Sequence, residues 1–170
     1  MTAPPTGALV VRRAAGPGEL ARVGALTEAA YEPFLLGRTD PYRERLRDAA
    51  TRDREAEVLV AELDDVVVGG VTVCPPGSPW REIAADDAEG EFRMLAVDPT
   101  RQGAGVGGAL VEAVLARFAA DGARGVVLSS LRQMDGAHRL YERHGFVRAP
   151  ERDWRPLPDV DLIAYVKDLP

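Results

Sequence analysis

The chain has 170 residues, a formal net charge of −6 and 46% hydrophobic residues. This length predicts a single domain spanning residues 1–170, and the acidic balance argues against nucleic acid as the main partner. One cysteine, Cys74, excludes an internal disulfide framework and suits a cytoplasmic protein. No apolar run reaches the roughly 18–20 residues of a membrane span, and residues 1–13 lack the features of a secretory signal, so we expect no membrane partner.

The first third of the chain predicts one strand and two helical segments. Residues 9–12 are a short β-rich run, typical of a strand. Apolar residues at helical spacing in residues 17–35, with Pro17 near the start, predict a helix. The more charged residues 40–55 predict a second helix.

A hairpin and a long connector follow. Residues 56–75 hold two β-branched runs around an Asp-Asp pair, the pattern of a β-hairpin. Gly69 and Gly70 within the second run predict a bulge or a close backbone approach. Residues 75–90 are rich in Pro, Gly and Asp, and connectors of this length are uncommon in compact domains unless they are functional or disordered.

The second half of the chain alternates strands and helices. Strands are predicted at residues 91–97, 125–131 and 159–169, and helices at residues 106–121 and 134–146. The resulting order, β-αα-ββ-β-α-β-α-β, describes a mixed α/β or α+β domain.

Four glycines lie within residues 103–108, directly before a predicted helix. Gly103, Gly105 and Gly108 satisfy the dinucleotide pattern G-x-G-x-x-G, but five residues separate them from the strand end at Val97, and the next strand ends without an acid. That context argues against a Rossmann unit and a nicotinamide oxidoreductase. No Gly-Lys-Ser/Thr follows, so the segment is not a P-loop either.

The glycines still predict a site for a phosphate or pyrophosphate. Bare backbone approaches a ligand closely, and the free N–H groups and dipole at a helix start favour an anion. The alternative is a glycine-rich loop that only allows the helix to pack tightly on the strand.

Two stretches resemble one known family. "LAVDPTRQGAGVGGALV", residues 95–111, resembles the acetyl-CoA-binding motif of the GNAT superfamily of N-acetyltransferases, and "AHRLYERHGF", residues 137–146, resembles the end of its last helix. The element order also matches over roughly residues 8–167. The resemblance implies a central mixed, mostly antiparallel sheet with a splayed strand pair, flanked by helices, and direct acetyl transfer from acetyl-CoA to an amine.

The same resemblance implies where acetyl-CoA binds as co-substrate. The strand end would pair with the pantetheine arm, one of its N–H groups would polarise the thioester carbonyl, and the glycine turn would hold the pyrophosphate. The cofactor-binding residues expected on this basis are Leu95, Ala96, Val97, Gln102, Gly103, Ala104, Gly105, Val106, Gly107 and Gly108.

Two residues are predicted to move protons. Tyr141 matches the family's usual donor to the leaving thiolate, and a phenol is protonated at pH 7; the alternative is a buried aromatic that packs its helix on the sheet. Glu91 lies where several family members carry the base for the incoming ammonium. Strand alternation places Arg93 on the same face, where it could pair with Glu91 and weaken it as a base. A solvated carboxylate at the strand edge is the alternative for Glu91.

One position departs from the family pattern. Many members carry an asparagine three residues before Ala137, where this chain has Met134. The neighbouring Ser129, Ser130 and Gln133 are candidates to replace it, and a lower affinity for the cofactor is the alternative. His138 and His144 are expected at the surface, and with one cysteine and two histidines we predict no metal site.

The acceptor is the least defined partner. Tyr31 and Trp80 are candidate substrate-binding residues, because the resemblance places their segments at the border of the acceptor site, and residues 150–156 are expected to form a proline-bounded loop. The sequence thus predicts an acetyl-CoA-dependent N-acetyltransferase acting on a primary amine of a small molecule, protein or peptide. A non-catalytic acyl-CoA-binding sensor of the same fold is the alternative, and a homodimer through the late strands is left open.

Overall fold

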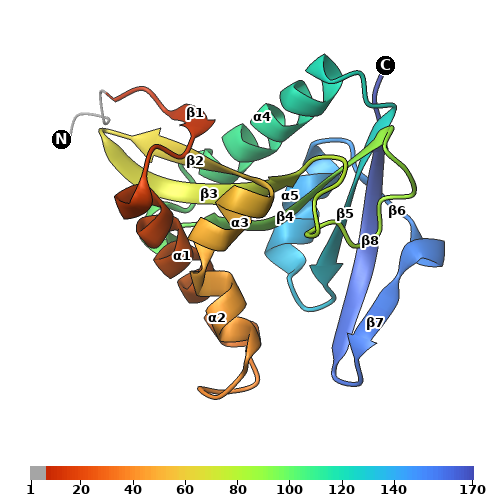
Figure 1. Ribbon diagram of the computed structural model, residues 1–170, viewed down its shortest axis with the longest axis horizontal. Helices are drawn as coiled ribbons and strands as arrows, with labels where there is room; N and C mark the ends of the chain where they lie inside the picture. The colour runs from red at the N-terminus through yellow and green to blue at the C-terminus, as the bar shows by residue number, and fades with distance from the viewer. Residues whose placement is uncertain (1–6) are drawn as a thin grey trace. The chain divides into compact units, whose positions relative to one another are not determined.

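The computed structural model describes residues 7–170, and its helices and strands are labelled in Figure 1. In chain order they are β1 (Val10–Arg13), α1 (Pro17–Tyr31), α2 (Tyr42–Arg47), α3 (Ala49–Glu55), β2 (Glu57–Leu63), β3 (Val66–Cys74), β4 (Glu89–Val97), α4 (Val106–Ala120), β5 (Gly125–Leu131), α5 (Asp135–Arg143), β6 (Val147–Arg148), β7 (Trp154–Leu157) and β8 (Val160–Asp168). Short 3₁₀ turns occupy Glu32–Phe34, Pro99–Arg101 and Pro150–Arg152.

The strands form a sheet with the order β1-β2-β3-β4-β5-β8-β6, and β7 pairs with β8. β4 and β5 run parallel, whereas β1 with β2, and β5, β6 and β7 with β8, are antiparallel. This mixed, mostly antiparallel sheet with flanking helices confirms the fold class expected from the sequence.

Contacts divide the chain into two compact units. The first unit runs to Thr72 and includes residues 94–110, and the second contains residues 73–93 and 111–170. β4 therefore contributes its first five residues to the second unit and its last four to the first. The expectation of one domain over residues 1–170 stays a prediction.

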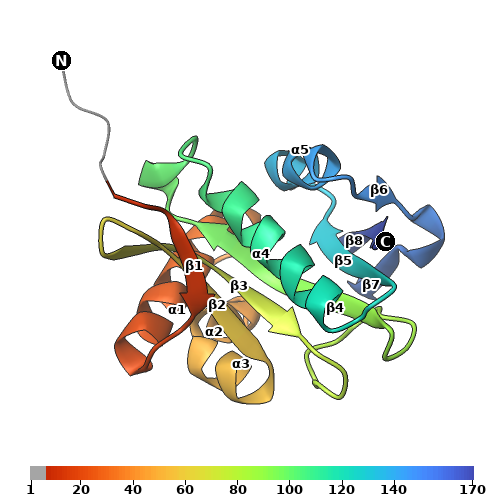
Figure 2. The same ribbon diagram turned by 90° about the horizontal axis from the view of Figure 1, so that it is seen from above.

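Within the first unit, Figure 2 shows α1, α2 and α3 on one side of β2 and β3. Six buried apolar residues of α1, α3, β2 and β3 form one core cluster: Val23, Leu26, Ala49, Val58, Val60 and Val67. A Cβ on Gly70 would lie 2.8 Å from Cγ1 of Val23, and one on Gly69 would lie 2.9 Å from Cγ1 of Val106. Side chains at either position would collide with these neighbours, so the glycine pair is needed for close packing here.

The predicted helix over residues 40–55 is two helices. Asp48 separates them with φ −83° and ψ 67°, outside the helical region. Its carboxylate accepts hydrogen bonds from the Thr51 amide at 3.0 Å and from the Thr51 hydroxyl at 2.7 Å, so it caps α3. Because a capped helix start satisfies amides that a continuous helix would bond internally, the aspartate favours the break.

Within the second unit, aromatic rings pack on the start of β4. The ring of Phe118 lies over Gly90, where a Cβ would come within 2.5 Å of it. Phe92 meets Phe146 edge to face, with 6.0 Å between ring centroids. Cys74, at the end of β3, is fully buried, and burial raises the pKa of its thiol to about 12.

Two late strands were not expected from the sequence. Residues 154–157, predicted as part of a loop, form β7, in which Trp154 pairs with Leu162 of β8. β6 contains two residues. Strands this short, one of them containing Pro156, carry too few alternating positions to be recognised in a sequence.

Candidate active site

The turn between β4 and α4 is held from its first residue. The amide of Asp98 donates to the Val68 carbonyl at 2.8 Å, and its carboxylate accepts from the Thr100 amide at 2.9 Å and from Nη2 of Arg22 at 2.9 Å. The Thr100 amide and hydroxyl, followed by Arg22, hold the pKa of Asp98 below its usual range. The start of the turn is thus tied to β3 and α1.

The rest of the turn has an open backbone. Gly103 and Gly105 have φ of 87° and 80°, a region that L side chains rarely adopt, and a Cβ at either position would have no neighbour within 4 Å. The two glycines are therefore needed for backbone conformation rather than for tight packing. The Gly105 carbonyl accepts from Ala109 at 3.0 Å, so α4 begins here, and the first-turn amides have no preceding helical carbonyl to bond. This arrangement fits a diphosphate.

β4 contains a distorted residue directly before the stretch predicted to hold the cofactor arm. Met94 is 5% exposed and has φ 54°, in the left-handed region. Such a conformation costs a non-glycine residue about 1–3 kcal/mol and is concentrated at functional sites, often as a strand bulge. No sequence signal marks Met94. Its geometry redirects the backbone N–H and C=O groups next to Leu95.

The register of β4 with β5 covers only the start of β4. Within residues 7–170 it pairs Glu89 with Gly125, Gly90 with Val126 and Glu91 with Val127. Leu95, Ala96 and Val97 lie outside it, whereas β5 pairs with β8 over its whole length, from Gly125 to Leu131. A strand pair that joins at one end is the pattern implied by the sequence resemblance.

Glu91 is fully buried, and its carboxylate is surrounded by backbone amides. Oε1 accepts from Glu82 at 3.0 Å, Ile83 at 3.1 Å and Ala84 at 2.9 Å, and Oε2 accepts from Glu82 at 3.0 Å. Glu91 is thus neither a solvated strand-edge residue nor exposed to an incoming amine. Its predicted role as a base stays a prediction.

Arg93 contacts a different carboxylate from the one suggested by strand alternation. Its Nε lies 2.9 Å from Oε1 of Glu82, and its guanidinium lies over the Trp80 ring, 5.4 Å from the centroid. Trp80 is 6% exposed. The indole is therefore packed under a cation of its own unit, and acceptor binding by Trp80 stays a prediction, as it does for the half-buried Tyr31 at the end of α1.

Tyr141 lies on α5, and its ring packs in a cluster of aromatic side chains. It is 6% exposed, and its ring meets Phe92 at 5.9 Å, Phe146 at 6.0 Å and Tyr165 at 6.1 Å between centroids. Burial raises the pKa of its phenol well above the usual range. The residue therefore keeps its proton at neutral pH, as a proton donor must before it acts.

His138 lies one helical turn before Tyr141 and is buried, which corrects the expectation of a surface residue. Its Nε2 lies 3.0 Å from the Leu131 carbonyl and 3.1 Å from Oγ of Ser130, and burial lowers its pKa. Since a carbonyl can only accept, a hydrogen bond to Leu131 requires the proton on Nε2, and Oγ of Ser130 lies within hydrogen-bonding distance of the same nitrogen. The spacing of three residues from Tyr141 was the sequence signal that could have placed His138 on the inner face. His144 is half-buried, with Nδ1 2.9 Å from the Leu140 carbonyl.

Across residues 7–170, no group of three or more His, Cys, Asp or Glu side chains is placed to hold a metal ion. None of the helices in this range has the length and apolar character to cross a membrane.

A family model described as an acetyltransferase (GNAT) domain matches residues 54–148, more than half of the chain. The chain therefore belongs to the GNAT acetyltransferase family, which confirms the family expected from the sequence.

Two curated relatives are mycothiol acetyltransferases. The protein from Cellulomonas flavigena is 35% identical over 116 residues, which cover 64% of this chain and 33% of the relative. The protein from Geodermatophilus obscurus is 37% identical over 114 residues, which cover 65% of this chain and 35% of the relative. The matched region thus spans about a third of the length of these curated relatives.

Solved structures share the fold over nearly the whole chain. A GNAT-family acetyltransferase from Staphylococcus aureus has a TM-score of 0.74 at 14% identity, covering 96% of this chain and 100% of that chain. A Salmonella typhimurium protein with its cofactor acetyl-CoA has a TM-score of 0.67 at 22% identity, covering 96% of this chain and 95% of that chain. At these identities the likeness establishes the fold alone.

Proposed function

We propose that this chain transfers an acetyl group directly from acetyl-CoA to a primary amine of a small molecule, a protein or a peptide. The observation that carries the proposal is the open turn before α4, where Gly103 and Gly105 hold positive φ with no neighbour in the space a Cβ would fill. An open backbone at a helix start is suited to the diphosphate of a coenzyme.

The residues proposed to hold the co-substrate follow from that turn. Backbone amides of residues 102–108 bind the diphosphate, and backbone groups of Leu95, Ala96 and Val97 pair with the pantetheine arm. The left-handed Met94 directly precedes these residues, which supports a backbone donor aimed at the thioester carbonyl. When bound, acetyl-CoA supplies the activated acyl group.

Tyr141 is proposed as the acid. The phenol gives its proton to the sulfur of the leaving thiolate as the new amide bond forms, and the resulting phenolate takes up a proton before the next turnover. Its burial supports this role because the proton is retained until negative charge develops beside it. The Phe92, Phe146 and Tyr165 rings fix the orientation of the phenol.

The acceptor is an amine that reaches the thioester unprotonated, and its chemical class is open to test. The names of the curated relatives make mycothiol-related amines one arm of an amine panel, beside polyamines, amino acids and peptides with free N-termini. Because the match spans about a third of those relatives, no acceptor is preferred before the assay.

The test is to incubate the full chain with acetyl-CoA and this panel, and to detect acetylated amine by mass spectrometry beside released thiol. We expect amine-dependent thiol release with one acetyl group transferred per thiol. Calorimetry measures acetyl-CoA binding in parallel. Tight binding with no acetylated product on any amine would contradict the proposal and favour the acyl-CoA sensor.

A further inference from the structure

The connector before β4 is folded around a buried carboxylate. Three successive amides, those of Glu82, Ile83 and Ala84, donate to Glu91 at 2.9–3.1 Å. Consecutive backbone N–H groups that converge in this way form a concave anion-binding turn. Here the anion belongs to the chain itself and is fully buried. We call residues 80–88 the anchored loop.

A second glutamate of β4 holds the next part of the loop. Glu89 is 8% exposed, and its Oε1 accepts from the Ala85 amide at 2.9 Å. Arg152 grips the same carboxylate with both terminal nitrogens, at 2.6 and 2.9 Å, and also donates to the Ile83 carbonyl. Bidentate contacts between an arginine and a carboxylate fix the orientation of the two groups as well as pairing their charges.

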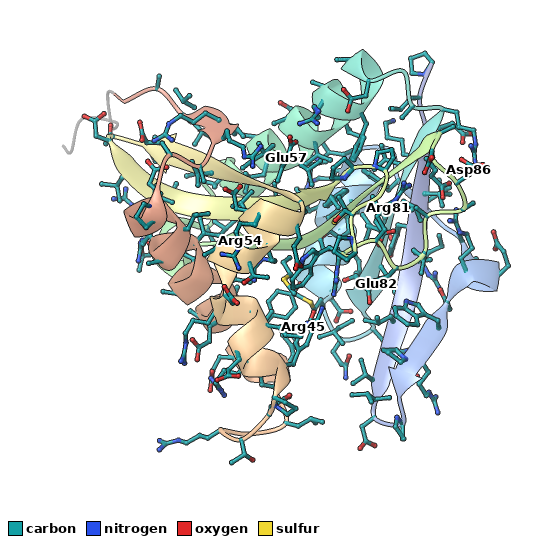
Figure 3. The ribbon with its side chains drawn as sticks, viewed as in Figure 1. Arg45, Arg54, Glu57, Arg81, Glu82 and Asp86 are labelled. Carbon is teal, nitrogen blue, oxygen red and sulfur yellow. The ribbon has the colours of Figure 1, made fainter. Side chains whose placement is uncertain are left out.

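The remaining contacts close the loop on itself. Arg81 donates to the carbonyls of Asp86 and Glu89, and Arg124 contacts Asp86 at 2.5 Å. In Figure 3, Arg81, Glu82 and Asp86 are seen along this segment. The connector, for which the sequence left a functional or a disordered segment open, thus has defined contacts within the second unit.

The anchored loop and the proposed acid contact opposite faces of β4. Successive side chains of a strand point to opposite faces, so Glu91 and Phe92 lie on opposite faces of β4. Tyr141 packs on Phe92 and therefore shares its face, whereas the anchored loop contacts Glu91. If the thiolate is protonated on the Tyr141 face, the other face is left for the incoming amine.

We propose that Glu91 is a positioning residue, which fixes the amides of Glu82, Ile83 and Ala84 so that the anchored loop forms one wall of the acceptor site. This inference rests on the proposed function. A base must reach the ammonium, but no part of the Glu91 side chain reaches solvent, and Oε1 already accepts three amide hydrogen bonds.

The test compares Glu91→Gln and Arg152→Lys with Glu19→Gln. Glutamine keeps the volume of Glu91, but it replaces a charged acceptor with a neutral one and turns an NH₂ group toward the Glu82 amide, so the hydrogen bonds that hold the loop are weakened. Arg152→Lys removes the bidentate contact with Glu89 while keeping the positive charge. It still tests the inference if Glu91→Gln fails to fold. Glu19, a residue of the first unit, is a matched control because its carboxylate also accepts from a backbone amide and an arginine.

We expect hydrogen exchange at residues 82–85 to accelerate about tenfold or more in Glu91→Gln and Arg152→Lys, but not in Glu19→Gln. The KM for the amine should rise about fivefold or more in the same two variants, while kcat, the KM for acetyl-CoA and the shape of the pH–rate profile stay within about twofold of the wild-type values.

Two results would overturn the inference. One is a loss of kcat of about a hundredfold or more in Glu91→Gln, with the acidic limb of the pH–rate profile removed and exchange at residues 82–85 unchanged, because it identifies Glu91 as the base. The other is unchanged amine KM in both variants despite faster exchange. Hydrogen exchange needs no substrate: if no amine is acetylated by the wild type, the proposed function fails, while exchange still decides whether Glu91 anchors the loop.

Discussion

The two loops attached to β4 treat backbone amides in opposite ways. The anchored loop before the strand directs the amides of residues 82–85 at carboxylates of the same chain, whereas the turn after the strand leaves open space at Gly103 and Gly105. An amide cluster that already holds an internal anion is a structural element, and an open one at a helix start is suited to an external anion. Backbone amides thus hold a loop in place where the chain provides a glutamate for them, and are suited to a bound anion where it does not.

The largest expected effect leaves both loops intact. In Tyr141→Phe the ring contacts remain but the proton donor is lost, so kcat should fall by about 10²–10⁴ with little change in acetyl-CoA affinity. Steady-state kinetics and calorimetry measure the two quantities. Tyr165→Phe is the control, because that ring lies 6.1 Å from Tyr141 and its hydroxyl donates to Glu142. Equal kcat for the wild type and Tyr141→Phe would remove Tyr141 as the acid.

A side chain placed at Gly105 tests whether the open turn before α4 binds acetyl-CoA. In Gly105→Val a branched side chain must occupy φ 80°, and we expect the turn to distort and the Kd for acetyl-CoA to rise about tenfold or more. Gly122→Val imposes the same strain at the other end of α4, where φ is 78° and a Cβ would also have open space. Calorimetry should show weakened binding only for Gly105→Val. Equal affinities in the two variants would break the contrast between the loops.

The contribution of Glu89 in the anchored loop to thermal stability should decrease as the pH falls. Burial alone would raise the pKa of Glu89, but hydrogen bonds from Arg152 and the Ala85 amide outweigh it and lower the pKa. A lowered pKa means stabilisation that is present above the carboxyl's ordinary range, about pH 4.3, and is lost as pH falls through the folded-state value. Thermal melting should therefore show the wild type above Glu89→Gln at pH 7, with the gap narrowing on acidification. A gap independent of pH would contradict this.

The smallest effect is expected at the start of the open turn. Arg22→Ala removes a half-exposed ion pair with Asp98, whereas the Thr100 hydrogen bonds to Asp98 remain. Exposed pairs contribute little, so the Kd for acetyl-CoA should rise less than about threefold. A tenfold rise in the calorimetric Kd would show that Arg22 does more than support the turn.

Local signals in the sequence predicted much of the architecture. Glycines before an apolar helical pattern identified the turn, because that signal depends on neighbours within a few positions. Tyr141 was singled out by the resemblance of residues 137–146 to the family's last helix. The element order followed from the same periodicities, apart from the break at Asp48 and the short strands β6 and β7.

Long-range contacts and backbone strain could not be predicted from the sequence. Glu91 was identified as a functional carboxylate, but nothing in its neighbours shows that amides seven to nine residues earlier fold back onto it. The left-handed conformation of Met94 is imposed by its surroundings and not by a residue type that prefers it. His138 was misplaced because a histidine is compatible with both surface and interior until its hydrogen-bond partners are known.

The buried state of Cys74 has a practical consequence for assays. With the only sulfhydryl of the chain enclosed and its pKa near 12, colorimetric disulfide reagents should find nothing to react with on the folded enzyme. Any yellow colour that develops during turnover then reports liberated coenzyme alone. One cysteine introduced at an exposed position, such as Asp87, would likewise accept a fluorophore selectively and follow the anchored loop in real time.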